Sequence, residues 1–358
     1  MTHHQHHSPA QQHSARGFTM MEGAAVVAVA AVAASVAVPL FQRVGCSASR
    51  AESAAKLATL SAAHGMYAAD WSDRQLTLCP DDLGAYQGDW SMYQASQGCA
   101  PSALLGQDAR GLEHSLSVAC GGSTGGGEHW LKPFSFKEPS LVGAFRLGNV
   151  RALNEYVGGR FLDSAFYAPD DRAITRRAWR NIDAGVDFDP ATFALTTYTM
   201  SPAAMFDPRV FGDGSSLTNP TFTNPNGDGA PSLGGEGYRS PSISLCQYPS
   251  HKTQLMEMWC MEGAPNITNP NMPGPTPYLA THTMFGRALA SYFDGSVRII
   301  TTRETQQAES RSGHKLWNRN VFGFHGYFGA QSYDWMSVCS PHFLTSSGIR
   351  GRDVVETP

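Results

Sequence analysis

The feature that most constrains this chain is an apolar run without charges near its N-terminus. Residues 23–41 contain no charged side chain, are rich in Ala and Val, and carry Ser35 as their one polar side chain. With residues 18–21, the run is long enough to cross a bilayer core of about 30 Å as a helix. Glu22 stands directly before it. A carboxylate is expensive in lipid, so this position indicates a functional role.

Three kinds of export signal compete for this run. A secretory signal peptide needs a small-residue cleavage site, which residues 35–37 (Ser-Val-Ala) provide, but it does not explain Glu22. A lipoprotein signal needs an apolar residue three positions before the cysteine, and Arg43 holds that place before Cys46. A plain signal anchor remains open, although it gives Glu22 no purpose.

The residues around Glu22 resemble the cleavage and methylation motif of type IV prepilins and type II secretion pseudopilins. The motif covers residues 16–22, Arg-Gly-Phe-Thr-Met-Met-Glu. In that family a prepilin peptidase cuts after the glycine, here Gly17, and the new terminal residue, here Phe18, is methylated. The fifth mature residue is a glutamate, here Glu22, and a proline often follows at the twenty-second place, here Pro39.

The resemblance implies how such subunits assemble. In a filament, the amino group of Phe18 in one subunit is neutralised by the Glu22 carboxylate of a neighbour, which pairs two charges that are costly in an apolar medium. Pro39 removes one helix hydrogen bond and permits a kink. The resemblance therefore implies a single-pass protein of the bacterial inner membrane with a periplasmic or extracellular domain. Its partners would be prepilin peptidase, other pilin or pseudopilin subunits, and the inner membrane.

The stretch after the apolar run predicts a helix. Residues 47–71 are rich in Ala and contain few helix breakers. Four of them recur at helical spacing and predict one packed face: Leu57, Leu60, His64 and Tyr67. We expect His64 to pack rather than to bind a ligand. Residues 18–71 thus predict one long helix, with a membrane half over about 18–41.

The remainder of the chain predicts a β-rich domain. The 36 Gly and 22 Pro of the chain favour turns and short strands. Asp294-Gly295 separates two β-prone runs, 288–293 and 296–301, which is the strongest short hairpin signal. Further strands are expected over residues 115–119, 193–200, 242–245 and 254–260, and short helices over 149–156 and 172–183.

The predicted fold class is α+β. Residues 1–17 form a His-rich leader, and residues 18–71 a long N-terminal transmembrane and amphipathic helix. This helix packs on an extracytoplasmic, antiparallel, β-rich pilin-like globular domain over residues 72–358.

Short downstream segments resemble a large family of bacterial pilin-like proteins with a C-terminal His-x9-Asp-Gly signature. Residues 67–74 resemble the end of that family's long helix, and residues 291–297 its strand–turn–strand signature. Ala168 stands where the family has a cysteine. His282 is the nearest histidine upstream of Asp294, with eleven rather than nine residues between them.

The cysteines argue for disulfides rather than for a metal or redox motif. There are 7 of them and no Cys-x-x-Cys pair, which argues against a zinc ribbon or a thioredoxin-type site. An extracytoplasmic domain permits disulfides. The preferred pairs are Cys79 with Cys99 and Cys246 with Cys260. The odd count leaves at least one free thiol.

The sequence offers little chemistry beyond this. No nucleophile or phosphate-loop motif is present, and a net charge of −4 without basic clusters argues against nucleic-acid binding. We therefore expect no enzyme and no cofactor. Calcium has a weak case, because oxygen ligands on a flexible loop suit this ion. The candidate ligands are Asp213, Asn224, Asn226 and Asp228. Such residues in loops more often serve turns.

Three functions follow from these features. The leading one is a structural subunit of a pilin-like or type II secretion pseudopilus-like filament, processed after Gly17. The alternative is a single-span, membrane-anchored surface-binding protein or enzyme that uses the apolar run only as a signal anchor. The third, suggested by the large downstream domain, is a carbohydrate- or surface-binding adhesin displayed on a filament.

Overall fold

The structure is a computed structural model. It describes residues 48–78, 81, 83–86, 90–98, 103–116, 144–169, 171–210, 237–257, 260–261, 278–279, 287–301, 304 and 347–354. The chain divides into two units, Met1–Arg50 and Ala51–Pro358. Apart from the helical residues 48–50, everything described below belongs to the second unit.

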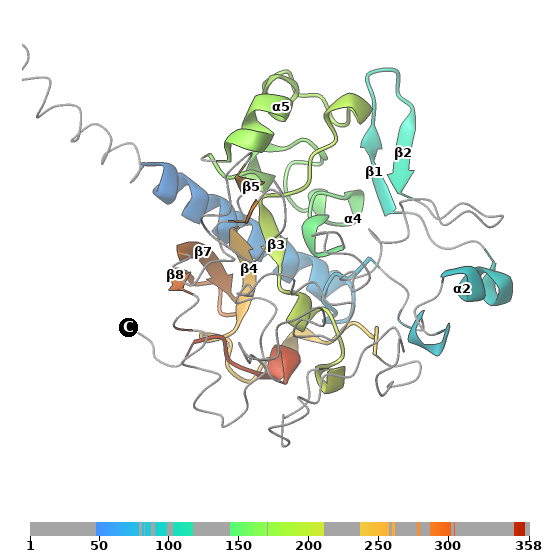
Figure 1. Ribbon diagram of the computed structural model, residues 1–358, viewed down its shortest axis with the longest axis vertical. Helices are drawn as coiled ribbons and strands as arrows, with labels where there is room; N and C mark the ends of the chain where they lie inside the picture. Colours follow the sequence, from blue (N-terminus) through green and yellow to red (C-terminus); the bar gives the residue numbers. More distant parts are fainter. Residues whose placement is uncertain are drawn as a thin grey trace, which may run out of the picture. The chain divides into compact units, whose positions relative to one another are not determined.

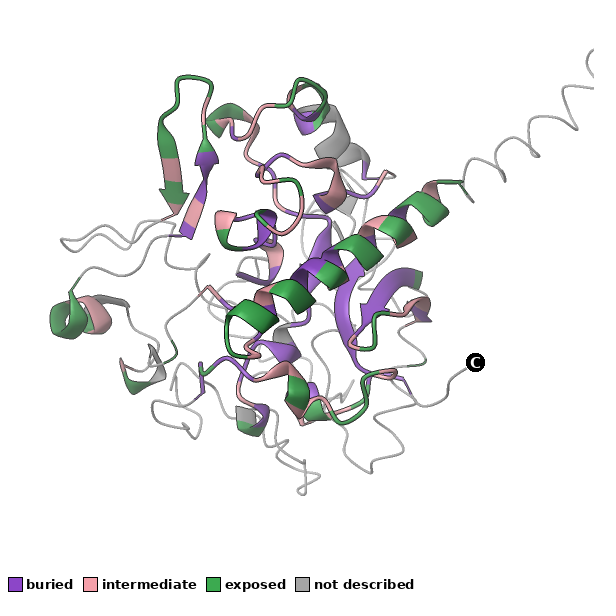
Figure 2. Cartoon of the chain, turned by 180° about the vertical axis from the view of Figure 1, so that it is seen from behind, coloured by how far each residue is buried: buried purple, intermediate pink, exposed green. Residues whose placement is uncertain are grey.

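The first element is a helical segment over residues 48–70 (blue in Figure 1). One of its faces is buried and the other exposed, as Figure 2 shows from behind. Leu57, Leu60 and His64 lie on the buried face, which confirms the packed face predicted from helical spacing. The amphipathic pattern therefore fixes which side of the helix meets the rest of the unit.

Hydrogen bonds join this helical segment to a central antiparallel sheet. Ser53 Oγ donates to Glu257 Oε1 at 2.8 Å and lies 2.8 Å from the hydroxyl of Tyr198. Ser61 Oγ donates to Gln254 Oε1 at 2.6 Å. Buried polar groups require such partners, and these partners come from two neighbouring strands.

The central sheet has four antiparallel strands in the order β3-β4-β7-β8. Their bounds are β3 Tyr198–Met200, β4 Thr253–Glu257, β7 Arg287–Tyr292 and β8 Val297–Thr301. Every residue of β4 is buried. The β7–β8 hairpin turns at Asp294-Gly295, where Gly295 has φ +81° and Asp294 accepts a hydrogen bond from the Ser296 amide at 2.9 Å. This confirms the hairpin predicted from Asp-Gly.

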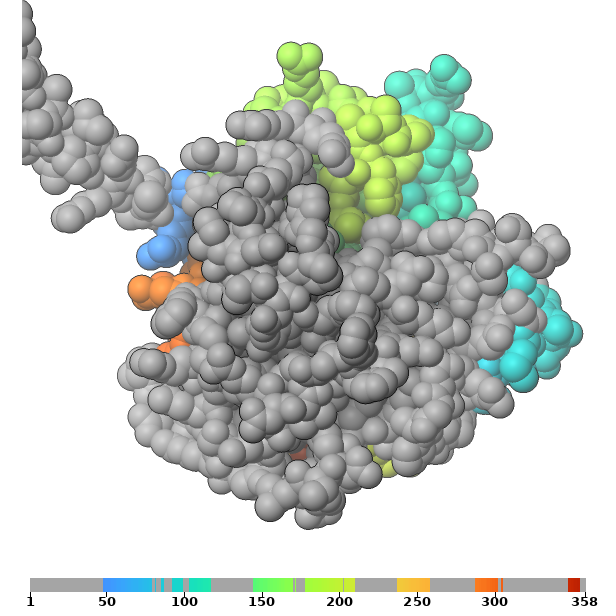
Figure 3. Space-filling model, viewed as in Figure 1, coloured from blue at the N-terminus to red at the C-terminus, as the bar shows by residue number. Residues whose placement is uncertain are grey.

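Two smaller sheets accompany it. They are β1 Ala103–Gln107 with β2 Glu113–Leu116, and β5 Cys260–Met261 with β6 Tyr278–Leu279. The Phe188 amide donates to the Gln107 carbonyl at 3.1 Å. Figure 3 accordingly shows the β1–β2 hairpin beside surface contributed by residues 151–210.

Helices in the described part of the second unit are otherwise short. The α-helices are α2 Trp90–Gln97, α4 Arg151–Asn154 and α5 Arg172–Asp183. The 3-10 turns are η1 Leu83–Tyr86, η2 Ala144–Arg146, η3 Ser164–Phe166, η4 Pro190–Thr192, η5 Pro202–Ala204, η6 Pro208–Val210, η8 Ile243–Leu245 and η12 Gly348–Arg350. Helix α5 has the predicted bounds.

Two expected strands are shorter than predicted or replaced. Within residues 193–200 only β3 is a strand. The amides just before it, of Thr196 and Thr197, donate to carbonyls in the 3-10 turns η2 and η3 rather than to another strand. Residues 243–245 form η8, since Leu245 and Cys246 amides donate back to Ser242 and Ile243. Ser242 keeps a single β-bridge to Arg74.

The predicted fold class is wrong. Among the described residues, no helix has both the length and the apolar character needed to cross a membrane. Residues 48–70 instead alternate buried and exposed positions and include Glu52, Lys56 and Asp70. The described part of the second unit mixes short helices and 3-10 turns with antiparallel strands, and is not the β-rich domain predicted. Residues 1–47 lie outside the described residues.

Candidate functional site

The helical segment ends in a turn over residues 71–73. The Asp73 amide donates to the Ala68 carbonyl at 2.6 Å, and Ser72 and Asp73 both have positive φ, 56° and 65°. Such angles are uncommon for residues other than glycine. The Asp73 carboxylate compensates by accepting hydrogen bonds from Ser242 and from the Ser244 amide. Burial raises the pKa of Asp73, but these bonds outweigh it, so the pKa lies below its ordinary value.

Beyond the turn lies a hollow of about 740 Å³, which we call the Trp71 hollow. This volume falls within the range of about 300–1,000 Å³ typical of ligand pockets. Its lining comes from six parts of the chain: the end of the helical segment with Trp71, residues 74–78 with Asp81, α2, β1, the start of α4, and Ser240.

Aromatic rings form one side of the Trp71 hollow. Tyr67 and Trp71 stack with ring centroids 5.7 Å apart and planes 17° apart, because residues four apart share one helix face. Trp71 is nevertheless 56% exposed. Tyr156 meets Tyr67 edge-on at 6.2 Å, and its hydroxyl donates to Asp70 Oδ2 at 2.7 Å. Burial, with smaller effects of Tyr156 and Asp81, raises the pKa of Tyr67 to about 12, so its phenol stays protonated.

Polar groups also line the Trp71 hollow. Arg74 Nη1 lies 2.9 Å from Asp81 Oδ2 and donates to the Ser240 carbonyl at 2.8 Å. The Ser240 amide donates to Asp81 Oδ1 at 3.0 Å. Asp81 and Arg74 thus neutralise each other while joining two segments that are far apart in sequence.

Gln75 is the unusual member of this lining. It is only 2% exposed, and neither its Oε1 nor its Nε2 has a hydrogen-bond partner within the described structure. Its backbone is fully engaged, because its amide donates to Pro241 and its carbonyl accepts from Ser240 Oγ. An unpaired buried polar group costs about 1–3 kcal/mol. Such a group calls for an explanation.

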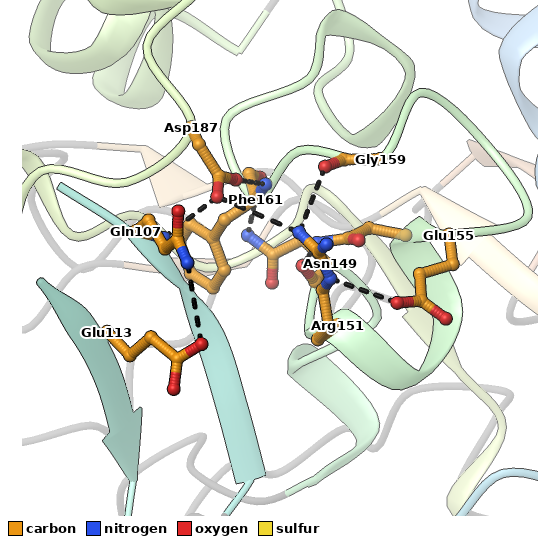
Figure 4. A network of polar contacts seen from close by, with 9 residues as sticks. Gln107, Glu113, Asn149, Arg151, Glu155, Gly159, Phe161 and Asp187 are labelled. Carbon is orange, nitrogen blue, oxygen red and sulfur yellow. Dashed lines mark hydrogen bonds and ion pairs between the residues drawn. The ribbon is translucent and has the colours of Figure 1, made fainter. Parts of the chain in front are cut away.

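Arg151 lines the hollow and is held in place by a network of polar contacts (Figure 4). Arg151 Nε donates to Glu155 Oε1 at 3.0 Å, and its Nη1 donates to the Gly159 carbonyl at 3.4 Å. Its Nη1 also lies 3.9 Å from Asp187 Oδ2. The Asp187 carboxylate accepts from the Gln107 amide at 2.8 Å, which ties β1 to the same network. The cation of Arg151 is therefore compensated before any ligand arrives.

This arrangement is suited to binding. It combines an exposed ring, hydrogen-bonding groups of both kinds, and charges that are already paired. Among the described residues, no group of three or more His, Cys, Asp and Glu side chains is placed to hold a metal ion.

Most of the site residues predicted from the sequence are not among the residues that the structure describes. The processing and assembly residues Gly17, Phe18, Glu22 and Pro39 are outside the described residues. So are Cys79, Cys99, His282 and the calcium candidates Asp213, Asn224, Asn226 and Asp228. Ala168 is buried in the core.

Cys246 is a free thiol directly after η8, and Cys260 belongs to β5. The side chain of Cys260 lies outside the described part of the structure, so the Cys246–Cys260 disulfide stays a prediction.

The Trp71 hollow itself was not predicted. Tyr67 was expected on the packed helix face, and Trp71 follows it by one helical turn. Nothing in the sequence brings Gln75, Arg151 and Ser240 together, because they are distant along the chain.

Comparison with protein-family models, with curated proteins and with solved structures finds no match to this chain. Its function is therefore argued from its own residues.

Proposed function

We propose that this chain is a structural subunit of a pilin-like or type II secretion pseudopilus-like filament, processed by a prepilin peptidase after Gly17. The observation that carries the proposal is one constellation: Gly17 before the cut, Glu22 at the fifth mature position, and a charge-free apolar run that contains Pro39. The apolar run alone supports only an anchor. Glu22 turns it into an assembly element, since its charge is useful only with a partner.

The proposed subunit resides in the bacterial inner membrane before assembly. Segment 18–41 inserts into the bilayer, and the domain that follows is periplasmic or extracellular. During assembly, Glu22 pairs with the Phe18 amino group of a neighbouring subunit, which removes two unpaired charges from apolar surroundings.

The attachment of the helical segment supports this proposal mechanically. Tension applied near the N-terminus must pass into the globular unit through the first part that is firmly anchored. Ser53 and Ser61 bond to the sheet side chains Glu257 and Gln254, and Lys56 Nζ donates to the Tyr167 carbonyl at 3.1 Å. These bonds are spread along two helical turns, so load is shared rather than concentrated at one residue.

Mass spectrometry of the native protein tests the processing. We expect a mature N-terminus at Phe18 carrying one methyl group, and a Gly17→Ala variant that stays uncut. A mature chain that begins at any other residue contradicts the proposal.

The alternative function is a single-span anchored surface-binding protein or enzyme, favoured by the Trp71 hollow. Glu22→Ala separates the two. A filament subunit loses assembly into sedimentable polymers, whereas a simple anchor inserts as well or better. Ser35→Ala is the matched control, because it removes an uncharged polar group from the same run, and this variant should assemble normally.

A further inference from the structure

We infer that the Trp71 hollow is a binding site for a neutral saccharide. It lies in the globular unit and uses none of the processing and assembly residues. The inference therefore goes beyond the proposed filament role and applies equally to an anchored protein. Two independent properties of the hollow lead to a sugar rather than to another small molecule.

The first property is an exposed aromatic platform. Trp71 stacks on Tyr67 with one face, and its 56% exposure leaves the ring accessible from the other side. The face of an aromatic ring carries partial negative charge and attracts the weakly positive C–H groups on one face of a pyranose. Tyr67 supports the platform from behind and fixes its orientation, so a ligand pays little to order the indole.

The second property is charge balance. Arg74 is paired with Asp81 at 2.9 Å, and Arg151 with Glu155 at 3.0 Å. An anionic ligand would have to compete with these carboxylates, and a cationic one with the guanidinium groups. A neutral ligand rich in hydroxyl groups faces neither cost. Its hydroxyls can bond the remaining donor and acceptor capacity of both ion pairs, because an ionised carboxylate accepts about four hydrogen bonds and a guanidinium donates five.

The test measures binding of neutral oligosaccharides to the purified full chain by isothermal titration calorimetry, in buffer free of detergents with sugar headgroups. The panel contains oligomers of glucose, xylose, mannose and N-acetylglucosamine, with oligogalacturonate as the anionic arm. We expect at least one neutral member to bind with a Kd below about 1 mM, and the anionic arm to bind more weakly.

Two variants assign the binding to this hollow. Trp71→Ala should weaken binding by about tenfold, through loss of stacking and apolar contact. Trp179→Ala is the matched control, because Trp179 is also exposed, at 42%, but lies on α5 and does not line the hollow. It should bind as the unchanged chain does.

The inference is overturned if no neutral oligosaccharide binds, if only the anionic arm binds, or if Trp71→Ala leaves the affinity unchanged.

Discussion

A buried ion pair at the start of β4 gives the sharpest prediction about stability. Lys252 Nζ lies 3.2 Å from Asp353 Oδ2, and both side chains are 0% exposed. The same carboxylate accepts from the Thr253 amide at 2.8 Å. The Asp353 amide donates to the His251 carbonyl at 2.8 Å, so this residue fastens the C-terminal segment to the strand.

The substitution to make is Asp353→Asn. It retains a carbonyl oxygen for the Thr253 amide but removes the negative charge, which leaves the Lys252 ammonium buried without its ionic partner. Breaking a buried pair by removing one partner costs about 3–5 kcal/mol. That is a large share of a typical domain stability of about 5–15 kcal/mol. By contrast, replacing both charges is often close to neutral. The double variant Lys252→Met/Asp353→Asn should therefore recover most of the loss.

Urea unfolding followed by tryptophan fluorescence measures both free energies by linear extrapolation. Glu52→Ala is the control, because it removes an ion pair at 2.7 Å in which the Glu52 carboxylate is 53% exposed and remains hydrated. It should change stability by less than about 0.5 kcal/mol. The reasoning is refuted if Asp353→Asn costs less than about 1 kcal/mol, or if the double variant is as unstable as the single one.

Four further predictions concern single residues. Burial lowers the pKa of His64 from 6.5 to about 4. Between these two pH values the unfolded chain binds a proton at His64 that the folded chain does not bind. The free energy of unfolding should therefore fall by up to about 3 kcal/mol as the pH drops from 6.5 to 4. Urea titrations should show that His64→Leu removes this part of the pH dependence, and an unchanged slope would count against burial as the cause. Gly106→Ala should destabilise by about 1–3 kcal/mol, because its Cβ would lie 2.7 Å from the Asp187 carboxylate. Gly65→Ala, with nothing within 4 Å, should stabilise the helical segment by about 0.5–1 kcal/mol, and thermal unfolding of both variants compares the signs. Burial raises the pKa of the Cys246 thiol to about 11, so iodoacetamide should label it slowly at pH 8 until urea unfolds the chain; a Cys246–Cys260 disulfide in non-reduced peptide maps would contradict the free thiol.

Local signals in the sequence located several elements correctly. Helical spacing placed Leu57, Leu60 and His64 on one buried face, and residues 172–183 proved to be a helix. Asp294-Gly295 marked the hairpin between β7 and β8. Each of these signals acts within a few residues, through side-chain periodicity or the backbone freedom of glycine. Such signals can therefore be recognised from the sequence alone. The processing motif at Gly17 and Glu22 is of the same local kind, and it stays a prediction.

Long-range packing decided what local patterns did not. The predicted strand over residues 242–245 became a 3-10 turn because this segment docks on the turn at Asp73, which captures Ser242 and Ser244 by their hydroxyl and amide groups. The predicted α+β fold class failed at its helix, because no helix among the described residues has both the length and the apolar character needed to cross a membrane.

The apolar run over residues 23–41, with Gly17 and Glu22 before it, is enough to identify a candidate processing and assembly segment from the sequence. The Trp71 hollow is the opposite case. Its residues form no sequence motif. Trp71, Gln75 and Arg151 line one hollow only because the end of the helical segment, the following extended stretch and α4 meet there. Composition and spacing describe neighbours along the chain, whereas burial of an unpaired amide beside an exposed ring depends on contacts between distant segments, and only the tertiary structure specifies those.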